Sequence, residues 1–406
     1  YKFEEKITPE VVKSVALQVL AFLQYGRDYS GHRPYIDLEK FKDRQAQVRQ
    51  VYEKFDWPNS LGQDIAKEFR SYILRSFQGT NLNQYLTQQC VIAFMLNLAG
   101  KLSADMKVLD FECGSGGYLA AVIDKGVKLE NIRGVDIDEL PYIIAKTYLA
   151  IYFKKTGNEV VKTLPIVKDN GLLFQGDNWN LVIGNPAGGN KYEHGEEQKI
   201  INEGLLNLTG KKHMFSEYEL SIQQAIRSVK IGGKICLVLP EGFFSNSQDE
   251  FLRKYVAKHC QILTIVSLPR GVFKKGTSTK QQKAGSQTSS QKMSILFAEK
   301  INQTLNKLDY QVFLASISEP ESKSESIESW LEPELNLVLD QWHEWQNNQK
   351  LKIIDNTKII KPYYKKPVQS KLIPVEAPLF DQQQKSPAPK PKLITTISQA
   401  LEKLFE

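Results

Sequence analysis

The feature that most constrains the fold is an alternation of short β-branched runs with amphipathic stretches, which begins near residue 105. Strands that alternate with helices are typical of a doubly wound, mostly parallel sheet. The sequence therefore predicts an α/β domain over residues 101–302. The runs expected to form strands are KVLDF, IRGVDI, NLVIGN, KICLVLP and ILTIVSLP.

The flanking regions differ from this domain in composition and in the spacing of their apolar residues. Apolar residues recur at helical spacing before residue 100, so we expect residues 1–100 to form a helical N-terminal domain. Residues 274–291 are polar and basic without apolar periodicity, and they are expected to form a flexible surface loop within the α/β domain. Residues 303–406 are rich in Ser, Glu, Gln, Lys and Pro, which indicates a linker and a C-terminal helical extension.

One stretch of this extension carries apolar side chains at helical spacing. Such a stripe predicts docking on the main domain, and docking on a partner helix is the alternative. The residues of the stripe are Leu335, Val338, Trp342 and Trp345.

Composition narrows the class of protein. Hydrophobic residues make up 41% of the chain and charged residues 24%, which fits a folded globular protein. The net charge of +7 is a mild basic excess and by itself is weak evidence for a nucleic-acid partner. The four cysteines are far apart and lack CxxC spacing, so we expect neither a metal site nor a disulfide framework, and a cytoplasmic location. No apolar run approaches the roughly 18 residues of a membrane span, so no membrane partner is expected.

A glycine-rich turn follows the first predicted strand, which ends at Asp110. The turn contains Gly114, Gly116 and Gly117 and precedes an amphipathic helix. Glycine lets the backbone pass close to a ligand at the carboxyl edge of a sheet, where a Cβ does not fit. Nucleotide-binding and methyltransferase domains share such a turn, and a plain tight turn is the alternative interpretation.

An acidic residue, Asp136, ends the next predicted strand about twenty residues later. A carboxylate in this place is suited to accept hydrogen bonds from both hydroxyls of a ribose. The alternative is a helix-capping aspartate, a role that Asp138 fits equally well. The glycine turn and the aspartate together indicate a nucleoside-containing ligand more strongly than either does alone.

A further strand-like run, NLVIG, delivers Asn185 and Pro186 to the same predicted sheet edge. The carbonyl oxygen of an Asn side chain can accept a hydrogen bond from an exocyclic amino group, and a neighbouring backbone carbonyl can accept the second hydrogen. This arrangement raises electron density on the nitrogen and aims its lone pair at a methyl donor about 3 to 3.5 Å away. A dedicated general base is then unnecessary. An Asn-Pro turn without a chemical role is the alternative.

From about residue 60 to 300, these motifs resemble the adenine-specific DNA methyltransferases, and particularly the modification subunit of type I restriction systems. The family's glycine turn reads Asp-Pro-Ala-Cys-Gly-Thr-Gly-Gly-Phe-Leu, where this chain has DFECGSGGYL. The stretch LNQYLTQQCVIAFMLNLAG, which contains Thr87, resembles the family segment that helps to cover the cofactor. The stretch GGKICLVLPEGFFSNSQDEFLRKYV also resembles family sequence.

The resemblance implies a Rossmann-like, S-adenosylmethionine-dependent methyltransferase domain. In this interpretation Asp169 faces the adenine ring of the cofactor. The positions expected to bind S-adenosylmethionine are Thr87, Asp110, Glu112, Cys113, Gly114, Gly116, Asp136, Ile137, Asp169 and Asn170.

The catalytic loop departs from the family pattern. The family has Asn or Asp, two prolines and an aromatic residue, and in the family the aromatic ring stacks on the adenine after it leaves the duplex. Losing such a stack costs about 1 to 3 kcal/mol, so this change alone predicts a slow enzyme. Phe243, Phe244 and Tyr192 are candidates to replace the ring, and a role as core aromatics or loop anchors is the alternative. The catalytic residues expected here are Asn185, Pro186, Ala187 and Gly188.

The cofactor turn departs as well, because Phe111 and Glu112 replace small residues beside the ligand. Glu112 either accepts a hydrogen bond from the methionine amino group of the cofactor or weakens cofactor binding.

Three hypotheses follow for the function. The first is a methyltransferase that modifies N6 of adenine as the modification subunit of a restriction or defence complex, with double-stranded DNA and a separate specificity subunit as partners. The second is a catalytically inactive, methyltransferase-like subunit that binds DNA or acts as a scaffold. The third is methylation of another amino group, such as that of a protein glutamine.

Overall fold

A computed structural model describes the protein over residues 62–76, 87–154, 164–187, 215–273, 292–302, 310–318, 327–354 and 372–374. The chain forms two compact units. The first unit comprises Tyr1–Thr87, Leu102–Phe174 and Phe273–Ser290, and the second unit comprises Gln88–Lys101, Gln175–Val272 and Gln291–Glu406. The expected helices before residue 62, the polar loop 274–291 and the last expected helix lie outside the described residues, and the domain boundaries expected at residues 100 and 302 stay predictions.

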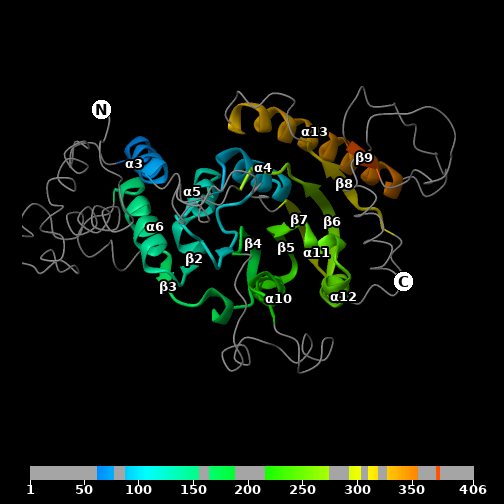
Figure 1. The fold of residues 1–406 in the computed structure, drawn as a ribbon, viewed down its shortest axis with the longest axis horizontal. Helices are drawn as coiled ribbons and strands as arrows, with labels where there is room; N and C mark the ends of the chain where they lie inside the picture. The colour runs from blue at the N-terminus through cyan, green and yellow to red at the C-terminus, as the bar shows by residue number, and fades with distance from the viewer. Residues whose placement is uncertain are drawn as a thin grey trace, which may run out of the picture. The chain divides into compact units, whose positions relative to one another are not determined.

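The first unit contains parallel strands in the order β3-β2-β1, of which Figure 1 labels β2 and β3. Asp110 at the end of β1 is in register with Gly134 of β2, and Asp136 at the end of β2 is in register with Lys168 of β3. The three strands therefore bring their carboxyl ends to one edge. Their bounds are Val108–Asp110 for β1, Ile132–Asp136 for β2 and Ile166–Lys168 for β3.

Helices connect and cover these strands. In the first unit α5 contacts β1 and β2, and α6 contacts β2 and β3. The helix α3, which packs on α6, corresponds to the helical pattern DIAKEFRSYILRSF in the sequence. The helices of this unit are α3 (Gln63–Ser76), α5 (Gly117–Asp124) and α6 (Glu139–Tyr152), with the short 3-10 helices η4 (Leu129–Asn131) and η5 (Gly171–Leu173).

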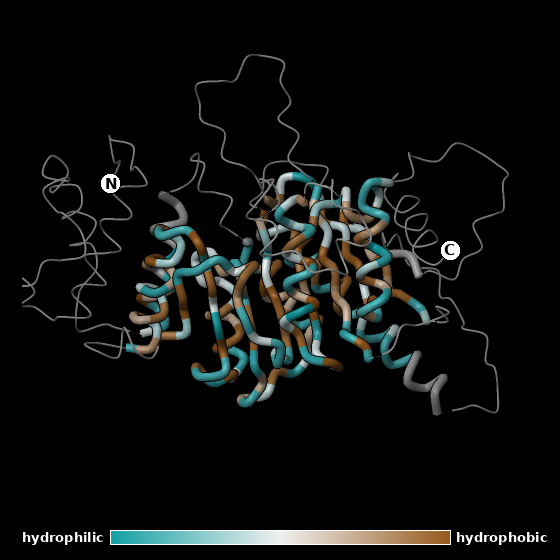
Figure 2. The backbone as a smooth tube through the Cα atoms, turned by 90° about the horizontal axis from the view of Figure 1, so that it is seen from below, coloured by the Kyte–Doolittle hydropathy of each residue, from teal (hydrophilic) through white to brown (hydrophobic). Residues whose placement is uncertain are grey.

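The strands β1 and β2 contain buried aliphatic and β-branched residues, whereas β3 is buried only at Ile166. Val108 and Leu109 of β1 and Val135 of β2 are fully buried. Parallel strands that helices cover on both faces read as nearly continuous apolar runs. In Figure 2 hydrophobic and hydrophilic segments alternate along the described part of the chain.

The second unit contains a mixed sheet in the order β4-β5-β7-β6-β8-β9. The pairs β4–β5 and β6–β8 are parallel, whereas β7 runs antiparallel to both β5 and β6, and β9 runs antiparallel to β8. The strands are β4 (Trp179–Gly184), β5 (Val229–Pro240), β6 (Cys260–Ser267), β7 (Met293–Lys300), β8 (Phe313–Ser316) and β9 (Leu372–Pro374). The helices are α4 (Gln89–Ala99), α10 (Glu217–Ser228), α11 (Gly242–Ser245), η6 (Ser247–Asp249), α12 (Glu250–His259) and α13 (Ile327–Ile354).

The sequence predicts a mostly parallel sheet, but β7 runs antiparallel to both of its neighbours. The five runs expected as strands are found as β1, β2, β4, β5 and β6. In the sheet β7 lies between β5 and β6, and it is the next described element after β6 in the chain. Parallel neighbours need a crossover connection, whereas antiparallel neighbours do not. The apolar run of β7 contains no information about its direction, which tertiary packing decides.

The apolar stripe of the C-terminal extension docks within the second unit. Leu335, Val338 and Trp342 of α13 are buried. The Trp342 ring contacts the rings of Phe297 on β7 and Phe313 on β8, at centroid distances of 6.2 and 5.7 Å. Burying a side chain of this size contributes about 1.5 to 3 kcal/mol. The expected docking of the stripe on the chain itself is therefore confirmed.

The four cysteines are free and buried. Within the described residues, no group of three or more His, Cys, Asp or Glu side chains is placed to hold a metal ion. None of the helices in the described ranges combines the length and the apolar character that crossing a membrane requires.

Candidate functional site

The turn after β1 has a backbone conformation that favours glycine. Gly114 and Gly116 have φ angles of 52° and 80°. The Cys113 N–H ties the turn to β2 by donating to the Val135 carbonyl oxygen at 2.9 Å. A Cβ on Gly116 would lie 3.2 Å from the Cβ of Ala145 on α6. The left-handed backbone and the close helix packing therefore both favour glycine at this position.

Asp136 ends β2 and holds this turn. Its Oδ2 accepts a hydrogen bond from the Gly114 N–H at 2.8 Å, and its Oδ1 accepts one from the Asp138 N–H at 2.9 Å. Burial raises the pKa of Asp136 to about 6, although these two N–H groups oppose the rise. Each carboxylate oxygen keeps a further lone pair for another donor. Asp138 occupies the N-cap position of α6, but its side chain makes no capping hydrogen bond, so the capping alternative is not supported for Asp138.

Asp110 ends β1 with a buried carboxyl group. Burial raises the pKa of Asp110 well above its ordinary value; the Glu112 N–H opposes this rise and the charge of Asp136 adds to it. The Asp110 Oδ2 atom has no hydrogen-bond partner among the described residues. Leaving a buried carboxyl oxygen unpaired costs folding free energy. Such an atom fits a site that receives a polar group of a ligand.

The turn after β3 completes the carboxyl edge of the first unit. The Asp169 N–H donates to the carbonyl oxygen of Asp136 at 3.0 Å. The side chain of Asn170 caps η5, because its Oδ1 accepts from the Leu172 N–H at 3.0 Å. The Asp169 side chain is exposed. Turns from three adjacent strands are therefore joined at this edge by backbone hydrogen bonds and side-chain caps.

Two positions that depart from the family pattern lie in the turn after β1. Phe111 is buried and Glu112 is half-buried. A Cβ on Gly171 would lie 1.6 Å from the Phe111 carbonyl oxygen, so the turns after β1 and β3 are in direct contact. Beside Asp136, the Ile137 side chain is 60% exposed. An exposed apolar side chain next to a buried carboxylate suits a ligand with both an apolar ring and hydroxyl groups.

Arg70 belongs to this edge although no motif contains it. It lies on α3, is buried, and donates to the Ser115 Oγ at 3.4 Å. Its guanidinium carbon lies 6.0 Å from the ring centroid of Tyr148 on α6. The two hydrogen-bonded residues are 45 positions apart. A single sequence holds no signal for such a contact, which explains why sequence reasoning missed it.

The positions expected to bind the cofactor fall into two groups. Thr87 is half-buried and lies just before α4. The others lie at the carboxyl edge of the first unit: Asp110, Glu112, Cys113, Gly114, Gly116, Asp136, Ile137, Asp169 and Asn170.

Asn185 lies in the second unit, directly after β4. The last residue of β4, Gly184, is in parallel register with Leu237 of β5. Asn185 therefore lies at the carboxyl end of this pair of strands. It is half-buried, Pro186 is buried and Ala187 is exposed. This places an amide side chain and a backbone carbonyl where a strand ends.

The candidates to replace the missing aromatic ring have different outcomes. Phe243 and Phe244 are buried, and their rings meet edge to face at a centroid distance of 4.7 Å. The structure thus places both as core aromatics, which was the alternative interpretation. Gly188 and Tyr192 lie outside the described residues.

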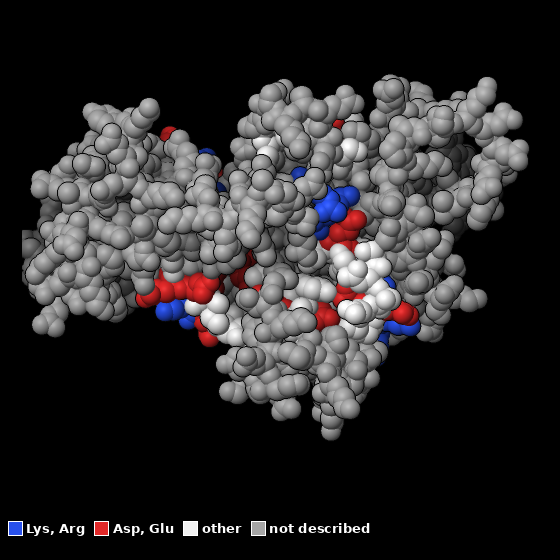
Figure 3. Space-filling model, viewed as in Figure 1, with Lys and Arg blue, Asp and Glu red and all other residues white. Residues whose placement is uncertain are grey.

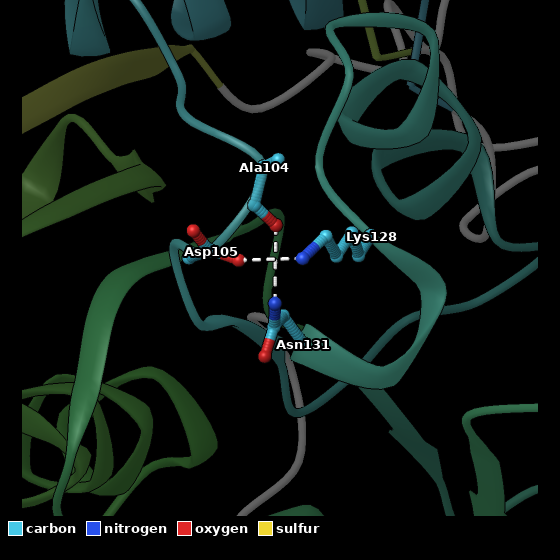
Figure 4. Close-up of polar contacts among 4 residues, drawn as sticks. All are labelled: Ala104, Asp105, Lys128 and Asn131. Atoms are coloured by element: carbon cyan, nitrogen blue, oxygen red, sulfur yellow. Dashed lines mark hydrogen bonds and ion pairs between the residues drawn. The ribbon is translucent and has the colours of Figure 1, made fainter.

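The amino-terminal edge of the sheet in the first unit is built differently (Figure 4). Lys128 forms an ion pair with Asp105 at 2.8 Å, and these side chains are 52% and 82% exposed. The Asn131 Nδ2 donates to the Ala104 carbonyl oxygen at 3.0 Å. These contacts brace the chain where it enters β1 and β2.

The parallel strands, the glycine turn and the acidic strand end define a Rossmann-like fold of the S-adenosylmethionine-dependent methyltransferase class. The chain belongs to the N-6 DNA methylase family, whose sequence profile matches residues 62–376. The methylase subunit of the type I restriction enzyme EcoEI from Escherichia coli is 28% identical over 255 residues, which cover 57% of this chain and 49% of that protein. The chain therefore spans about half the length of this relative. The uncharacterized protein YtxK of Bacillus subtilis is 24% identical over 235 residues, which cover 56% of this chain and 66% of that protein.

Solved structures agree on the fold. A candidate class I S-adenosylmethionine-dependent methyltransferase from Listeria monocytogenes matches with a TM-score of 0.54 at 20% identity, over 82% of this chain and 98% of that chain. A type I restriction-modification system methyltransferase subunit from Streptococcus thermophilus matches with a TM-score of 0.55 at 15% identity, over 74% of this chain and 61% of that chain. At these identities the similarity shows the fold alone.

Proposed function

We propose that the chain is an S-adenosylmethionine-dependent methyltransferase that modifies N6 of adenine in DNA, as the modification subunit of a restriction or defence complex. The observation that carries the proposal is the carboxyl edge of the first unit. There Asp136 accepts from the glycine turn, and the buried Oδ2 of Asp110 has no partner within the described ranges. Membership of the N-6 DNA methylase family supports the substrate class.

In this proposal the carboxyl edge holds S-adenosylmethionine. Asp136 offers the remaining lone pairs of its carboxylate to the two ribose hydroxyls. The exposed Ile137 offers an apolar surface to the adenine ring of the cofactor, beside Asp169. Gly114 and Gly116 leave the backbone accessible for the methionine part. The other proposed cofactor residues are Thr87, Asp110, Glu112, Cys113 and Asn170.

Asn185 provides the chemistry at the amino group of the target base. Its Oδ1 accepts one hydrogen of the exocyclic amino group, and the carbonyl oxygen of Pro186 accepts the other. With both hydrogens held, the nitrogen keeps its lone pair for the reaction and needs no general base. Bound S-adenosylmethionine supplies an electrophilic methyl group. Ala187 and Gly188 offer no aromatic face to the base, so we expect a rate roughly 10- to 100-fold below that of a site with such a ring.

Double-stranded DNA and a specificity subunit are the proposed partners. In this proposal the specificity subunit chooses the DNA sequence. On the face drawn in Figure 3, basic atoms of the described residues lie next to acidic atoms. DNA is therefore proposed because of Asn185 and Pro186 after β4 and because of the family, and not because of a basic surface.

Methyl transfer from tritium-labelled S-adenosylmethionine to duplex DNA that lacks N6-methyladenine tests this function. After digestion to nucleosides, mass spectrometry is expected to detect N6-methyldeoxyadenosine. The substitution Asn185→Ala removes the acceptor for the amino group, so the rate should fall on the order of 100-fold. As the matched control, Asn131→Ala removes an amide that bonds Ala104 at the amino-terminal edge, and the rate should not change.

The other hypotheses correspond to other outcomes of this assay. Recovery of the label in a glutamine of a protein would show that the methyl acceptor is that amide rather than DNA. A folded chain that transfers no label to any DNA, with or without partner subunits, contradicts the proposed activity and leaves the DNA-binding scaffold.

A further inference from the structure

The chain returns to the carboxyl end of the β4–β5 pair immediately after β5. Because Gly184 is in parallel register with Leu237, Asn185 lies level with Val238. The strand β5 ends at Pro240. Residues 241–246, which we name the 241–246 turn, follow directly and include α11. This turn therefore begins at the end of the β4–β5 pair where Asn185 also lies, within the second unit.

Arg253 on α12 clamps the 241–246 turn. Its Nη1 atom donates to the carbonyl oxygens of Phe243 and Asn246, both at 2.8 Å. The side chain is 2% exposed. Hydrogen bonds from a charged donor are roughly twice as strong as neutral ones, and a buried guanidinium without acceptors is costly. The clamp therefore favours one conformation of the turn over others.

The turn itself is compact. The Asn246 N–H donates to the Gly242 carbonyl oxygen at 2.8 Å, and a Cβ on Gly242 would lie 2.6 Å from the Asn246 Nδ2. Phe243 and Phe244 anchor it in the core of the second unit. Ser245 and Asn246 are exposed, and Gly242 is half-buried. The turn thus combines a buried, hydrogen-bonded inner side with polar groups on its outer side.

A second tie holds the residue from which α12 starts. The Tyr218 hydroxyl on α10 donates to the Asp249 Oδ1 at 2.7 Å. Asp249 is buried and occupies the N-cap position of α12. Burial raises the pKa of the Tyr218 hydroxyl, and the hydrogen bond to Asp249 adds to the rise. Burial lowers the pKa of Arg253, and the charge of Asp249 opposes this. α10 thereby fixes the start of the helix that carries Arg253.

We propose that Arg253 is a positioning residue for the target base, because it holds the 241–246 turn as a fixed wall beside Asn185. The inference rests on the proposed function, because the target base is the substrate of that function. A wall that does not move restricts the orientations of the base next to the amide of Asn185. Loss of the clamp should therefore lower kcat for methyl transfer, whereas binding of S-adenosylmethionine by the first unit should not change.

The substitution Arg253→Met tests the clamp with two independent readouts. Amide hydrogen exchange is expected to become faster at Phe244, Asn246 and Asp249, whose N–H groups bond within this segment. The value of kcat is expected to fall roughly 10- to 100-fold. The affinity for S-adenosylmethionine should equal that of the wild type. Arg253→Lys keeps a charged donor and should recover part of both effects.

The neighbouring Lys254 supplies the matched control. Its ammonium pairs with Glu250 at 2.7 Å, and its side chain is 51% exposed. Lys254→Met should change neither the exchange rates nor kcat. Tyr218→Phe removes a single hydroxyl and should change both readouts in the same direction as Arg253→Met, by a smaller amount. Should Arg253→Met not fold, Arg253→Lys and Tyr218→Phe provide the same comparison.

The outcomes separate this inference from the proposed function. Unchanged exchange in a folded Arg253→Met chain overturns the clamp. Faster exchange with an unchanged kcat overturns the positioning role while leaving the methyltransferase activity intact. The absence of methyl transfer by the wild-type chain contradicts the proposed function, and with it the positioning of a target base. Hydrogen exchange in Arg253→Met then tests only whether Arg253 holds the 241–246 turn.

Discussion

The two ends of the parallel strands in the first unit are built in opposite ways. At the amino-terminal end, Lys128 and Asp105 form an exposed ion pair, and Asn131 bonds a backbone carbonyl (Figure 4). At the carboxyl end, Asp110 and Asp136 are buried, and burial raises the pKa of each. Exposed ion pairs have small effects on stability, whereas burying a carboxylate costs folding free energy. The comparison teaches that one end braces the strands, and it supports the proposal that the other end binds a ligand.

The largest expected effect comes from Asp136→Ala. This change removes the proposed acceptor of both ribose hydroxyls, and it also leaves the Gly114 and Asp138 N–H groups without their acceptor. We expect the affinity for S-adenosylmethionine to fall on the order of 100-fold or more, measured by isothermal titration calorimetry. Asp105→Ala at the amino-terminal end is the control and should leave the affinity unchanged. Equal losses of affinity in Asp136→Ala and Asp105→Ala would show that the two ends of the strands do not differ in cofactor binding.

A pair of glycines extends the comparison to stability. A Cβ on Gly171 would lie 1.6 Å from a backbone oxygen at the carboxyl end, whereas a Cβ on Gly126 would meet nothing within 4 Å. Gly171→Ala should lower the free energy of unfolding by about 1 to 3 kcal/mol or more. Gly126 has a φ of 92°, so Gly126→Ala should cost about 1 kcal/mol from backbone strain alone. Urea unfolding of both variants measures the difference, and a larger loss in Gly126→Ala would contradict the packing described for the two turns.

The pH dependence of cofactor binding should follow the ionisation of the Asp136 carboxyl group. Its pKa in the fold, about 6, lies above the ordinary value of 3.8. The contribution of this group to the stability of the unliganded fold is therefore fully present below 3.8 and is lost as the pH rises through about 6. The ribose hydroxyls need the ionised acceptor, so binding has the opposite sign. We expect the affinity to fall by up to about tenfold for each pH unit below 6.

Calorimetric titrations at several pH values provide this measurement. Asp136→Asn should bind weakly and lack the pH dependence. An affinity of the wild type that stays constant between about pH 5 and 7 would exclude Asp136 as the acceptor.

The smallest effect is expected at the amino-terminal end. Lys128→Met removes one member of the exposed ion pair with Asp105. The melting temperature should stay within about 2 °C of the wild type, and the affinity for S-adenosylmethionine should not change. A large loss of cofactor affinity in this variant would show that the two ends of the sheet are coupled rather than separate.

Local patterns in the sequence predict much of the first unit. β-branched runs predict β1 and β2, because such residues are favoured in buried strands. The glycines at positions 114, 116 and 117 predict a turn after the first strand, and the structure has a turn there, in which Gly114 and Gly116 have positive φ angles. An acid at the end of a strand predicts a carboxylate at the carboxyl edge, and Asp136 lies there. That this carboxylate binds a ribose stays a prediction.

The features that the sequence does not predict depend on contacts between distant residues. The direction of β7 is set by its neighbours in the sheet. Phe243 has the same sequence signal whether its ring stacks on a base or, as here, is buried in the core. The reach of Arg253 to two carbonyl groups depends on how α12 packs on the turn after β5. Spacing along the chain contains no information about these choices, because packing makes them.

Titration of S-adenosylmethionine into the purified chain at pH 8 tests the central claim most directly. The account predicts saturable binding of one molecule per chain, competed by S-adenosylhomocysteine and not by NAD. The absence of saturable binding to a chain that circular dichroism shows to be folded would contradict it.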